Sequence, residues 1–178
     1  MPFLKEMANR YAAHGFAVLI PDLFWRQSEP LTELPDQSEA ATQQAFELYE
    51  TFDTEKALDD IAASLRWLRE NENTSGKTAV LGYCLGGLLS FMSGCQLDID
   101  AAVAYYGVGI EKNLQNKNMI RKPIMMHFAE NDSFVPAKTI KELQETFANN
   151  IAFVKPNANT QNISDVYYFN SHNNCSCI

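Results

Sequence analysis

The stretch Gly82-Tyr83-Cys84-Leu85-Gly86-Gly87 decides the fold of this chain of 178 residues. The apolar run Thr78-Ala79-Val80-Leu81 precedes it, and a second apolar run follows. The pattern is that of the nucleophile elbow, G-x-S-x-G, with cysteine in the serine position. We therefore expect a strand, a sharp turn that needs the small residues Gly82 and Gly86, and then a helix. The helix N-terminus would favour the thiolate of Cys84, whereas the alternative is a structural cysteine beside a glycine-rich turn.

Strand and helix signals alternate along the chain. Apolar spacing predicts helices along residues 3–12, 39–52, 58–68 and 140–147, and apolar runs predict strands along residues 16–20, 78–81, 101–106 and 123–128. Gly15 would end the first helix, and Asp53 would cap the third. Alternation of this kind is typical of an α/β fold with a mostly parallel sheet, and the length suits one domain, 1–178.

The composition is that of an ordinary globular chain. Apolar residues make up 46% and charged residues 20% of the sequence, and the net charge is −8. A negative chain without a run of Lys or Arg argues against nucleic acid as a partner. No apolar run reaches the ~20 residues that a membrane span needs, and residues 1–6 lack the layout of a signal peptide. We expect a cytoplasmic protein with no membrane partner.

Four cysteines are present, Cys84, Cys95, Cys175 and Cys177. One residue separates the last two, which is poor geometry for a mutual disulfide, and the absence of a C-x-x-C pair argues against a zinc site. In a cytosolic protein all four would be reduced. We expect Cys95 to pack in the helix after the elbow, and we expect no metal site.

A catalytic thiol needs a base, and the chain has three histidines. His14 stands at the end of a predicted helix, which it would cap. His127 lies within a predicted strand, as core or sheet-edge histidines do. His172 lies in a polar segment near the C-terminus and, taken alone, would be a solvated loop histidine.

A base also needs a group that orients it, and Asp132 is the candidate. It follows the predicted strand 123–128, and ligands of open α/β sheets bind beyond the carboxyl ends of the strands. The alternative is an ordinary turn aspartate. The chain order Cys84, Asp132, His172 is the nucleophile–acid–histidine order of α/β-hydrolases.

From about Met7 to Asn149 the sequence resembles the dienelactone hydrolase family. The matching segments are residues 15–24 with the exit Pro21-Asp22-Leu23, residues 48–53, the elbow, residues 105–109 and residues 132–136. Several motifs in one order are more specific than any one of them. The resemblance implies the α/β-hydrolase fold, with a mostly parallel sheet flanked by helices, and hydrolysis of a small ester or lactone of the dienelactone type. It implies no cofactor and no metal ion.

The resemblance also implies the residues of the site. A Cys-His-Asp triad would use Cys84 as nucleophile, His172 as base and Asp132 to orient the base. Three further residues would bind the substrate. Arg26 would bind the carboxylate of the substrate, and the backbone N–H of Leu85 would donate to the oxyanion. Tyr106 would line the site. The substrate would then be anionic, although a loop arginine such as Arg26 can also be merely solvated.

The chain departs from the family at both ends. Members begin with a strand that supplies a second oxyanion donor and a glutamate near the cysteine, so we expect a fold without the first strand or strands and without the final helix. Residues 157–162 look inserted, and the sequence is atypical after about residue 150. We expect such a chain to be a weak or inactive enzyme, and either poorly soluble or self-associating. The alternative is a catalytically impaired hydrolase fold that acts as a binding module. Glutamine amidotransferases share a G-x-C-x-G turn but not the segment around Asp132.

Overall fold

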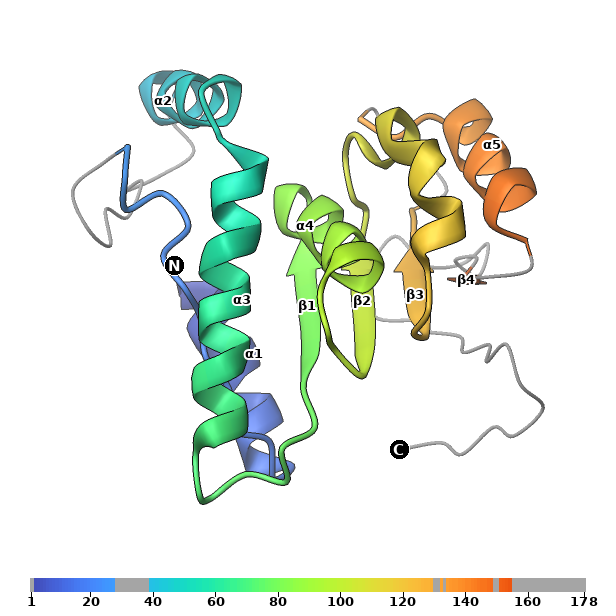
Figure 1. The fold of residues 1–178 in the computed structure, drawn as a ribbon. Coiled ribbons are helices and arrows are strands. Elements are labelled where there is room, and N and C mark those ends of the chain that lie inside the picture. Colours follow the sequence, from blue (N-terminus) through green and yellow to red (C-terminus); the bar gives the residue numbers. More distant parts are fainter. Residues whose placement is uncertain (1, 28–38, 130–131, 133, 149–150, 155–178) are drawn as a thin grey trace. The chain divides into compact units, whose positions relative to one another are not determined.

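The computed structural model describes residues 2–27, 39–129, 132, 134–148 and 151–154 (Figure 1). They fall into two compact units, Met1–Gly76 and Lys77–Ile178, which are taken one at a time below. A single domain over residues 1–178 stays a prediction.

The first unit contains the helices α1 (Pro2–Ala13), α2 (Glu39–Glu50) and α3 (Thr54–Glu70). All three lie where apolar spacing predicts a helix. Gly15 follows α1 as expected, and its backbone N–H donates a hydrogen bond of 3.0 Å to the carbonyl of Ala12. Its φ of 89° lies in the left-handed region, which glycine adopts without strain.

Helix α3 begins at the cap that the sequence predicts. Asp53 has the extended backbone of an N-cap residue, and its Oδ1 accepts a hydrogen bond of 3.1 Å from the backbone N–H of Lys56. The apolar stripe of α3 is buried at Leu58, Ile61 and Leu65. The helical period of the apolar residues therefore decides which face of α3 is buried.

The apolar run 16–20 does not form the expected strand. Among the described residues it belongs to no sheet, and Phe16, Val18 and Ile20 are 55%, 41% and 45% exposed. A strand is stable only where a neighbouring strand shares its backbone hydrogen bonds. The residue types of the run favour a strand, but the described chain supplies no ladder partner for it.

Where it is described, the second unit is built on a parallel sheet of four strands in the order β1-β2-β3-β4. In chain order its elements are β1 (Ala79–Tyr83), α4 (Leu85–Gln96), β2 (Ala101–Tyr105), η1 (Ile110–Met119), β3 (Ile124–His127), α5 (Ala137–Phe147) and β4 (Ile151–Val154). A helical segment joins each strand to the next, as parallel neighbours require. The strands expected along 78–81, 101–106 and 123–128 and the helix along 140–147 are confirmed.

Helix α4 forms the centre of the core of the second unit. It packs against β1 and β2 and also contacts η1 (Figure 1). Residues 87–95 of α4 are all buried, including Cys95 as expected. The ring of Phe91 meets the ring of Phe147 from α5 at a centroid distance of 5.4 Å. A helix that is apolar on nearly every side is stable only in such a setting.

Two elements of the second unit lack a sequence signal. The 3-10 helix η1 is mostly polar, so it shows no apolar period, although Ile110 at its start is fully buried. Strand β4 has four residues, which is too short for periodicity to separate it from a loop. Both elements depend on contacts with the rest of the unit.

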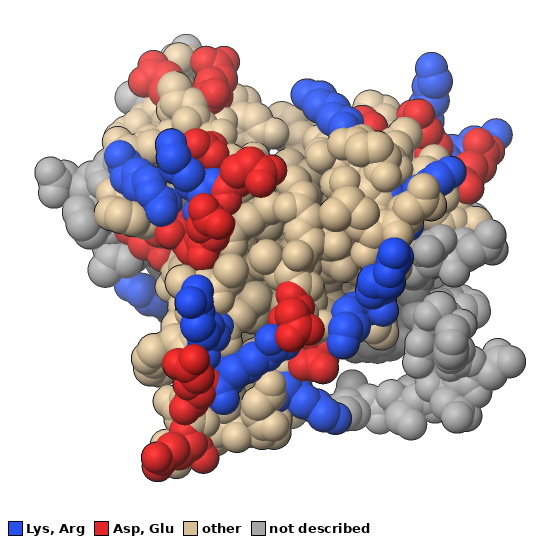
Figure 2. All heavy atoms as spheres, in the orientation of Figure 1, with Lys and Arg blue, Asp and Glu red and all other residues tan. Residues whose placement is uncertain are grey.

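Charged side chains of both signs are interspersed on the face shown in Figure 2. Some form exposed pairs one helical turn apart, such as Glu6 with Arg10 and Lys141 with Glu145. Within the described residues, every helix is too short or too polar to span a membrane.

Candidate active site

The predicted elbow is present between β1 and α4. Cys84 follows the last residue of β1 and precedes the first residue of α4, with φ 55° and ψ −114°. Such a backbone is strained for a residue with a side chain, and strain of this kind is typical of functional sites. The side chain of Cys84 is exposed. The turn therefore holds the thiol at the helix N-terminus, accessible to solutes.

The glycines of the elbow differ in why they are needed. A Cβ on Gly82 would lie 2.1 Å from the carbonyl oxygen of Gly86, and a Cβ on Gly87 would lie 2.6 Å from the carbonyl oxygen of Tyr105. A Cβ on Gly86 would meet nothing within 4 Å. The expectation that Gly86 must itself lack a side chain is therefore wrong. The tight approach is made by the backbone of Gly86, and Gly82 is the residue that must leave room for it.

The two described cysteines have opposite environments. Cys95 is 8% exposed, and burial raises the pKa of its thiol to about 12. Cys84 is exposed at the start of α4. Cys175 and Cys177 lie outside the described residues. Of the two described thiols, only Cys84 is placed to act as a nucleophile.

The backbone N–H of Leu85 is available beside the thiol. Leu85 is the first residue of α4, and amides of a first helical turn have no carbonyl partner within the helix. The amides of Gly87 and Leu88 both donate to the carbonyl of Cys84, at 2.9 and 3.2 Å. The N–H of Leu85 is the first amide after Cys84, and in elbow enzymes the amide after the nucleophile is an oxyanion donor.

Tyr106 lies next to the elbow, directly after the neighbouring strand β2. The register pairs Tyr83 with Tyr105 and Tyr105 with His127, so Cys84 and Tyr106 leave the sheet side by side. Tyr106 has a positive φ of 39°, and its N–H donates a hydrogen bond of 2.7 Å to the carbonyl of His127. Cys84 and Tyr106, which both have a positive φ, thus lie together at the carboxyl ends of their strands.

Asp132 is brought to the same edge. Burial raises the pKa of the Tyr106 phenol, and the negative charges of Cys84 and Asp132 raise it further. Both groups therefore lie within electrostatic reach of one phenol. This is the arrangement expected for residues that follow the carboxyl ends of neighbouring parallel strands.

One oxygen of Asp132 also shapes its own turn. Oδ1 accepts hydrogen bonds from the backbone N–H groups of Phe134 (2.8 Å) and Val135 (3.3 Å). The turn role, which the sequence leaves as the alternative, is therefore present. Oδ2 makes no hydrogen bond to a described residue, so this oxygen remains for a further partner.

The expected base, His172, lies outside the described residues. The other two histidines have the structural places predicted for them. His14 sits at the end of α1 with its Nδ1 2.8 Å from the carbonyl oxygen of Arg10. His127 is 7% exposed at the end of β3, and burial lowers its pKa to about 4. Its ring stacks on Tyr105 at 4.3 Å, and Tyr105 stacks on Tyr83 at 4.9 Å.

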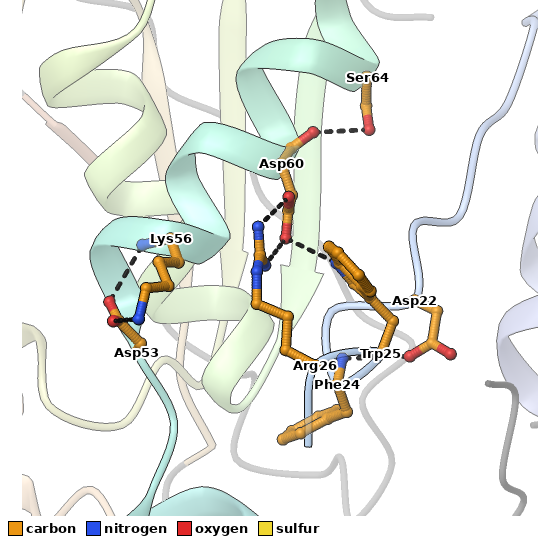
Figure 3. A network of polar contacts seen from close by, with 8 residues as sticks. All are labelled: Asp22, Phe24, Trp25, Arg26, Asp53, Lys56, Asp60 and Ser64. Atoms are coloured by element: carbon orange, nitrogen blue, oxygen red, sulfur yellow. Dashed lines mark hydrogen bonds and ion pairs between the residues drawn. The ribbon is translucent and has the colours of Figure 1, made fainter. Parts of the chain in front are cut away.

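Arg26 belongs to the first unit and is ion-paired (Figure 3). Both of its Nη atoms donate to the carboxylate of Asp60 in α3, Nη2 to Oδ1 at 2.8 Å and Nη1 to Oδ2. The hydrogen bond to Asp60 raises the pKa of Arg26, and the same bond lowers the pKa of Asp60. The guanidinium carbon lies 4.4 Å from the centre of the Trp25 ring. Arg26 is thus no freely solvated loop arginine, and its role in substrate binding stays a prediction.

Sequence reasoning missed Asp60 and Trp25, because nothing local to either residue signals the contact. Within the described parts of the chain, no cluster of His, Cys, Asp and Glu is suited to hold a metal ion. The described polar groups at the sheet edge are a thiol, a phenol, a carboxylate and a free amide. Groups of these kinds are the ones that nucleophilic acyl transfer uses.

Carboxymethylenebutenolidases are similar to this chain in sequence. The chain is 37% identical to the carboxymethylenebutenolidase of Pseudomonas putida over 148 residues, 83% of this chain and 62% of that protein. It is 34% identical to carboxymethylenebutenolidase 1 of Cupriavidus pinatubonensis over 149 residues, 84% of this chain and 63% of that protein. The chain therefore spans less than two thirds of the length of these curated relatives.

Solved structures show the same fold at lower sequence identity. A protein from Klebsiella pneumoniae, provisionally assigned as a dienelactone hydrolase, superposes with a TM-score of 0.76 over 89% of this chain and 69% of its own, at 16% identity. An esterase of Pyrococcus furiosus matches 56% of this chain and 52% of its own with a TM-score of 0.50, at 18% identity. The fold is thus the α/β-hydrolase fold. Because the sequence profile of the dienelactone hydrolase family also matches residues 2–155, the chain belongs to the dienelactone hydrolase family.

Proposed function

We propose that this chain hydrolyses a carboxylic ester or a lactone through a thioester on Cys84. The observation that carries the proposal is the strained elbow, which exposes the thiol of Cys84 at the start of α4. Tyr106 and Asp132 at the same edge of the sheet supply further polar groups. Membership of the dienelactone hydrolase family supports an acyl-transfer reaction.

The first half of the reaction forms the thioester. The thiolate of Cys84 adds to the substrate carbonyl, and the backbone N–H of Leu85 donates a hydrogen bond to the oxyanion. When the tetrahedral intermediate collapses, the bond between the carbonyl carbon and the ester oxygen breaks, and the leaving oxygen takes a proton from His172. In a lactone the new hydroxyl group stays attached to the acyl chain.

The second half releases the product. Water gives a proton to His172 and adds to the thioester carbonyl, after which the bond to sulfur breaks and the thiolate returns. The products are a carboxylic acid and a hydroxyl group. Asp132 would orient His172 through Oδ2, the oxygen that its own turn does not use. The role of His172 is supported by its place after Asp132 in the chain and by the family pattern.

The substrate that we favour is a small lactone that carries a carboxylate. The relatives named carboxymethylenebutenolidase support this choice, since that name describes a butenolide ring with a carboxymethylene group. Tyr106 would line the site and Arg26 would bind the carboxylate. Cytoplasmic location and self-association stay predictions.

The test is acyl-enzyme trapping. The chain and its Cys84→Ala variant are mixed with 4-nitrophenyl acetate, and the intact masses are recorded together with the release of nitrophenol. We expect one acetyl group on Cys84 and continued turnover in the first protein, and neither in the variant. Equal turnover by a folded Cys84→Ala variant would overturn the proposal. Saturable binding of a lactone without any acetylation would favour the binding module instead.

A further inference from the structure

The guanidinium of Arg26 has one edge that Asp60 holds and one edge that no described residue occupies. Its five N–H groups lie in one plane and form two forks for a carboxylate, one between the two Nη atoms and one between Nε and a single Nη. Asp60 occupies the first fork. Among the described residues, nothing accepts a hydrogen bond from Nε. The Arg26 side chain is 34% exposed, so it is not sealed from solutes.

The groups that hold Arg26 are themselves held (Figure 3). Oδ2 of Asp60 accepts a second hydrogen bond, of 3.2 Å, from Nε1 of Trp25. Asp60 extends from α3, a helix anchored by its buried apolar stripe. The turn that carries Trp25 and Arg26 is shaped by Asp22, whose Oδ1 accepts a bond of 3.1 Å from the N–H of Phe24. The guanidinium is therefore fixed by two hydrogen bonds in its plane and by the Trp25 ring on its face.

We propose that Asp60 and Trp25 are positioning residues, which fix Arg26 so that its Nε–Nη edge binds one planar carboxylate. The proposal rests on the proposed function only for the identity of the natural occupant, the carboxylate of the substrate. Binding then needs no further ordering of a long flexible side chain. Because Asp60 balances the charge of Arg26, the open edge selects an anion by the geometry of two parallel hydrogen bonds more than by charge.

The direct test follows the Nε–H signal of Arg26 by nuclear magnetic resonance in the Cys84→Ala chain. The signal is assigned by its loss in an Arg26→Lys variant. Sodium acetate is titrated against sodium chloride at equal ionic strength. We expect a saturable shift with acetate and none with chloride, which cannot span both donors. An absent shift, or the same shift with both salts, would show that the edge binds no carboxylate.

Variants then test the two positioning residues. Asp60→Ala should weaken acetate binding about three- to tenfold, since the guanidinium is no longer held. Asp60→Asn should bind within about twofold of the parent chain, because its amide oxygen still accepts from Nη. Asp59→Ala is the matched control. It removes a neighbouring exposed carboxylate that acts on Arg26 only through its charge, so acetate should bind within about twofold of the parent chain. Equal or tighter binding by Asp60→Ala would show that Asp60 merely competes with the ligand.

A second variant keeps the proposal testable if Asp60→Ala does not fold. Trp25→Phe keeps a ring under Arg26 and removes the N–H that holds Asp60, so acetate should bind about two- to threefold more weakly. Unchanged affinity would remove Trp25 from the proposal.

Kinetics separate this proposal from the proposed function. With an anionic and a neutral ester of the same leaving group, Asp60→Ala should raise KM for the anionic ester alone and leave kcat unchanged. If the chain cleaves no ester but acetate still shifts the Arg26 signal, the proposed function fails and the carboxylate site stands. If Cys84 cleaves both esters but acetate does not bind, the positioning proposal fails and the proposed function stands.

Discussion

The backbone N–H of Cys84 donates a hydrogen bond of 3.0 Å to the carbonyl oxygen of Tyr105. Tyr105 is the register partner of Tyr83, so this bond extends the β1–β2 ladder by one residue into the elbow. The N–H of Tyr106 continues the row with its bond to the carbonyl of His127. The sheet itself therefore holds the strained backbone of Cys84 in place, which a free loop would not do.

We predict that Cys84 reacts with iodoacetamide well before Cys95. Cys84 is exposed, whereas Cys95 is buried in α4 with a pKa raised to about 12, so at neutral pH its thiolate is scarce. Peptide mapping after brief alkylation of the folded chain checks this. The same reaction in urea is the control, since unfolding should remove the difference. Faster labelling of Cys95 in the folded chain would contradict the described elbow.

We predict that alanine is tolerated at Gly86 and not at Gly82. The Cβ of Gly82→Ala would lie 2.1 Å from a backbone oxygen, so the elbow must shift, at a cost of about 1–3 kcal/mol or more in the free energy of unfolding. Gly86→Ala has open space in the first turn of α4 and should be neutral or more stable by up to about 1 kcal/mol. Urea unfolding of the two variants compares them. Equal destabilisation would mean that the elbow is not as tight as described.

Local signals in the sequence predict most of the described fold. Asp53 caps α3, and the stripe that includes Leu58 and Ile61 is buried, because cap chemistry and helical period act within a few residues. The strand predicted along residues 16–20 is wrong for the opposite reason. Its residues favour a strand, but a strand exists only with a partner, and no local pattern announces that partner.

In the candidate site, too, local signals predict some residues and miss others. The glycine neighbours of Cys84 identify it in the sequence. Asp132 is predicted to lie near it because ligands of open α/β sheets bind beyond the carboxyl ends of the strands. The bond between Arg26 and Asp60 joins residues 34 positions apart in the sequence. An isolated arginine and an isolated helical aspartate carry no signal that they will meet. Only the packing of the first unit shows that the arginine is held.

We predict that His127 makes the stability of the folded chain depend on pH. Burial lowers its pKa to about 4, below the ordinary value of about 6.5 that it has when unfolded. Between these values the unfolded chain binds more protons, so stability should fall by about 2–3 kcal/mol as the pH falls from 6.5 to 4. Below pH 4 this contribution should level off, because the histidine then binds its proton in both states.

Urea unfolding at several pH values measures that slope. His127→Gln should flatten the part due to this residue, even if the variant is less stable at every pH. His14→Gln is the control, since His14 is an exposed residue at the end of α1. A slope that is the same with and without His127 would show that this histidine is not buried in its neutral form.

We predict that asparagine and alanine at position 132 have different effects. Oδ1 of Asp132 accepts from the N–H groups of Phe134 and Val135, and an asparagine oxygen can accept the same bonds. Asp132→Asn should therefore keep the stability of the parent chain. It should lose about 10²–10⁴ in kcat for ester hydrolysis, because an amide at this position cannot stabilise a charged base.

Asp132→Ala should lose activity to a similar degree and also about 1 kcal/mol of stability, since two backbone N–H groups lose their acceptor. Ester turnover and urea midpoints for both variants separate the two roles. Full activity of Asp132→Asn would leave Asp132 with its turn alone. Equal stability of Asp132→Ala and the parent chain would show that the turn does not depend on the carboxylate. We expect one oxygen of Asp132 to serve the turn and the other to serve catalysis. This division of roles requires that both variants lose activity and that only Asp132→Ala loses stability.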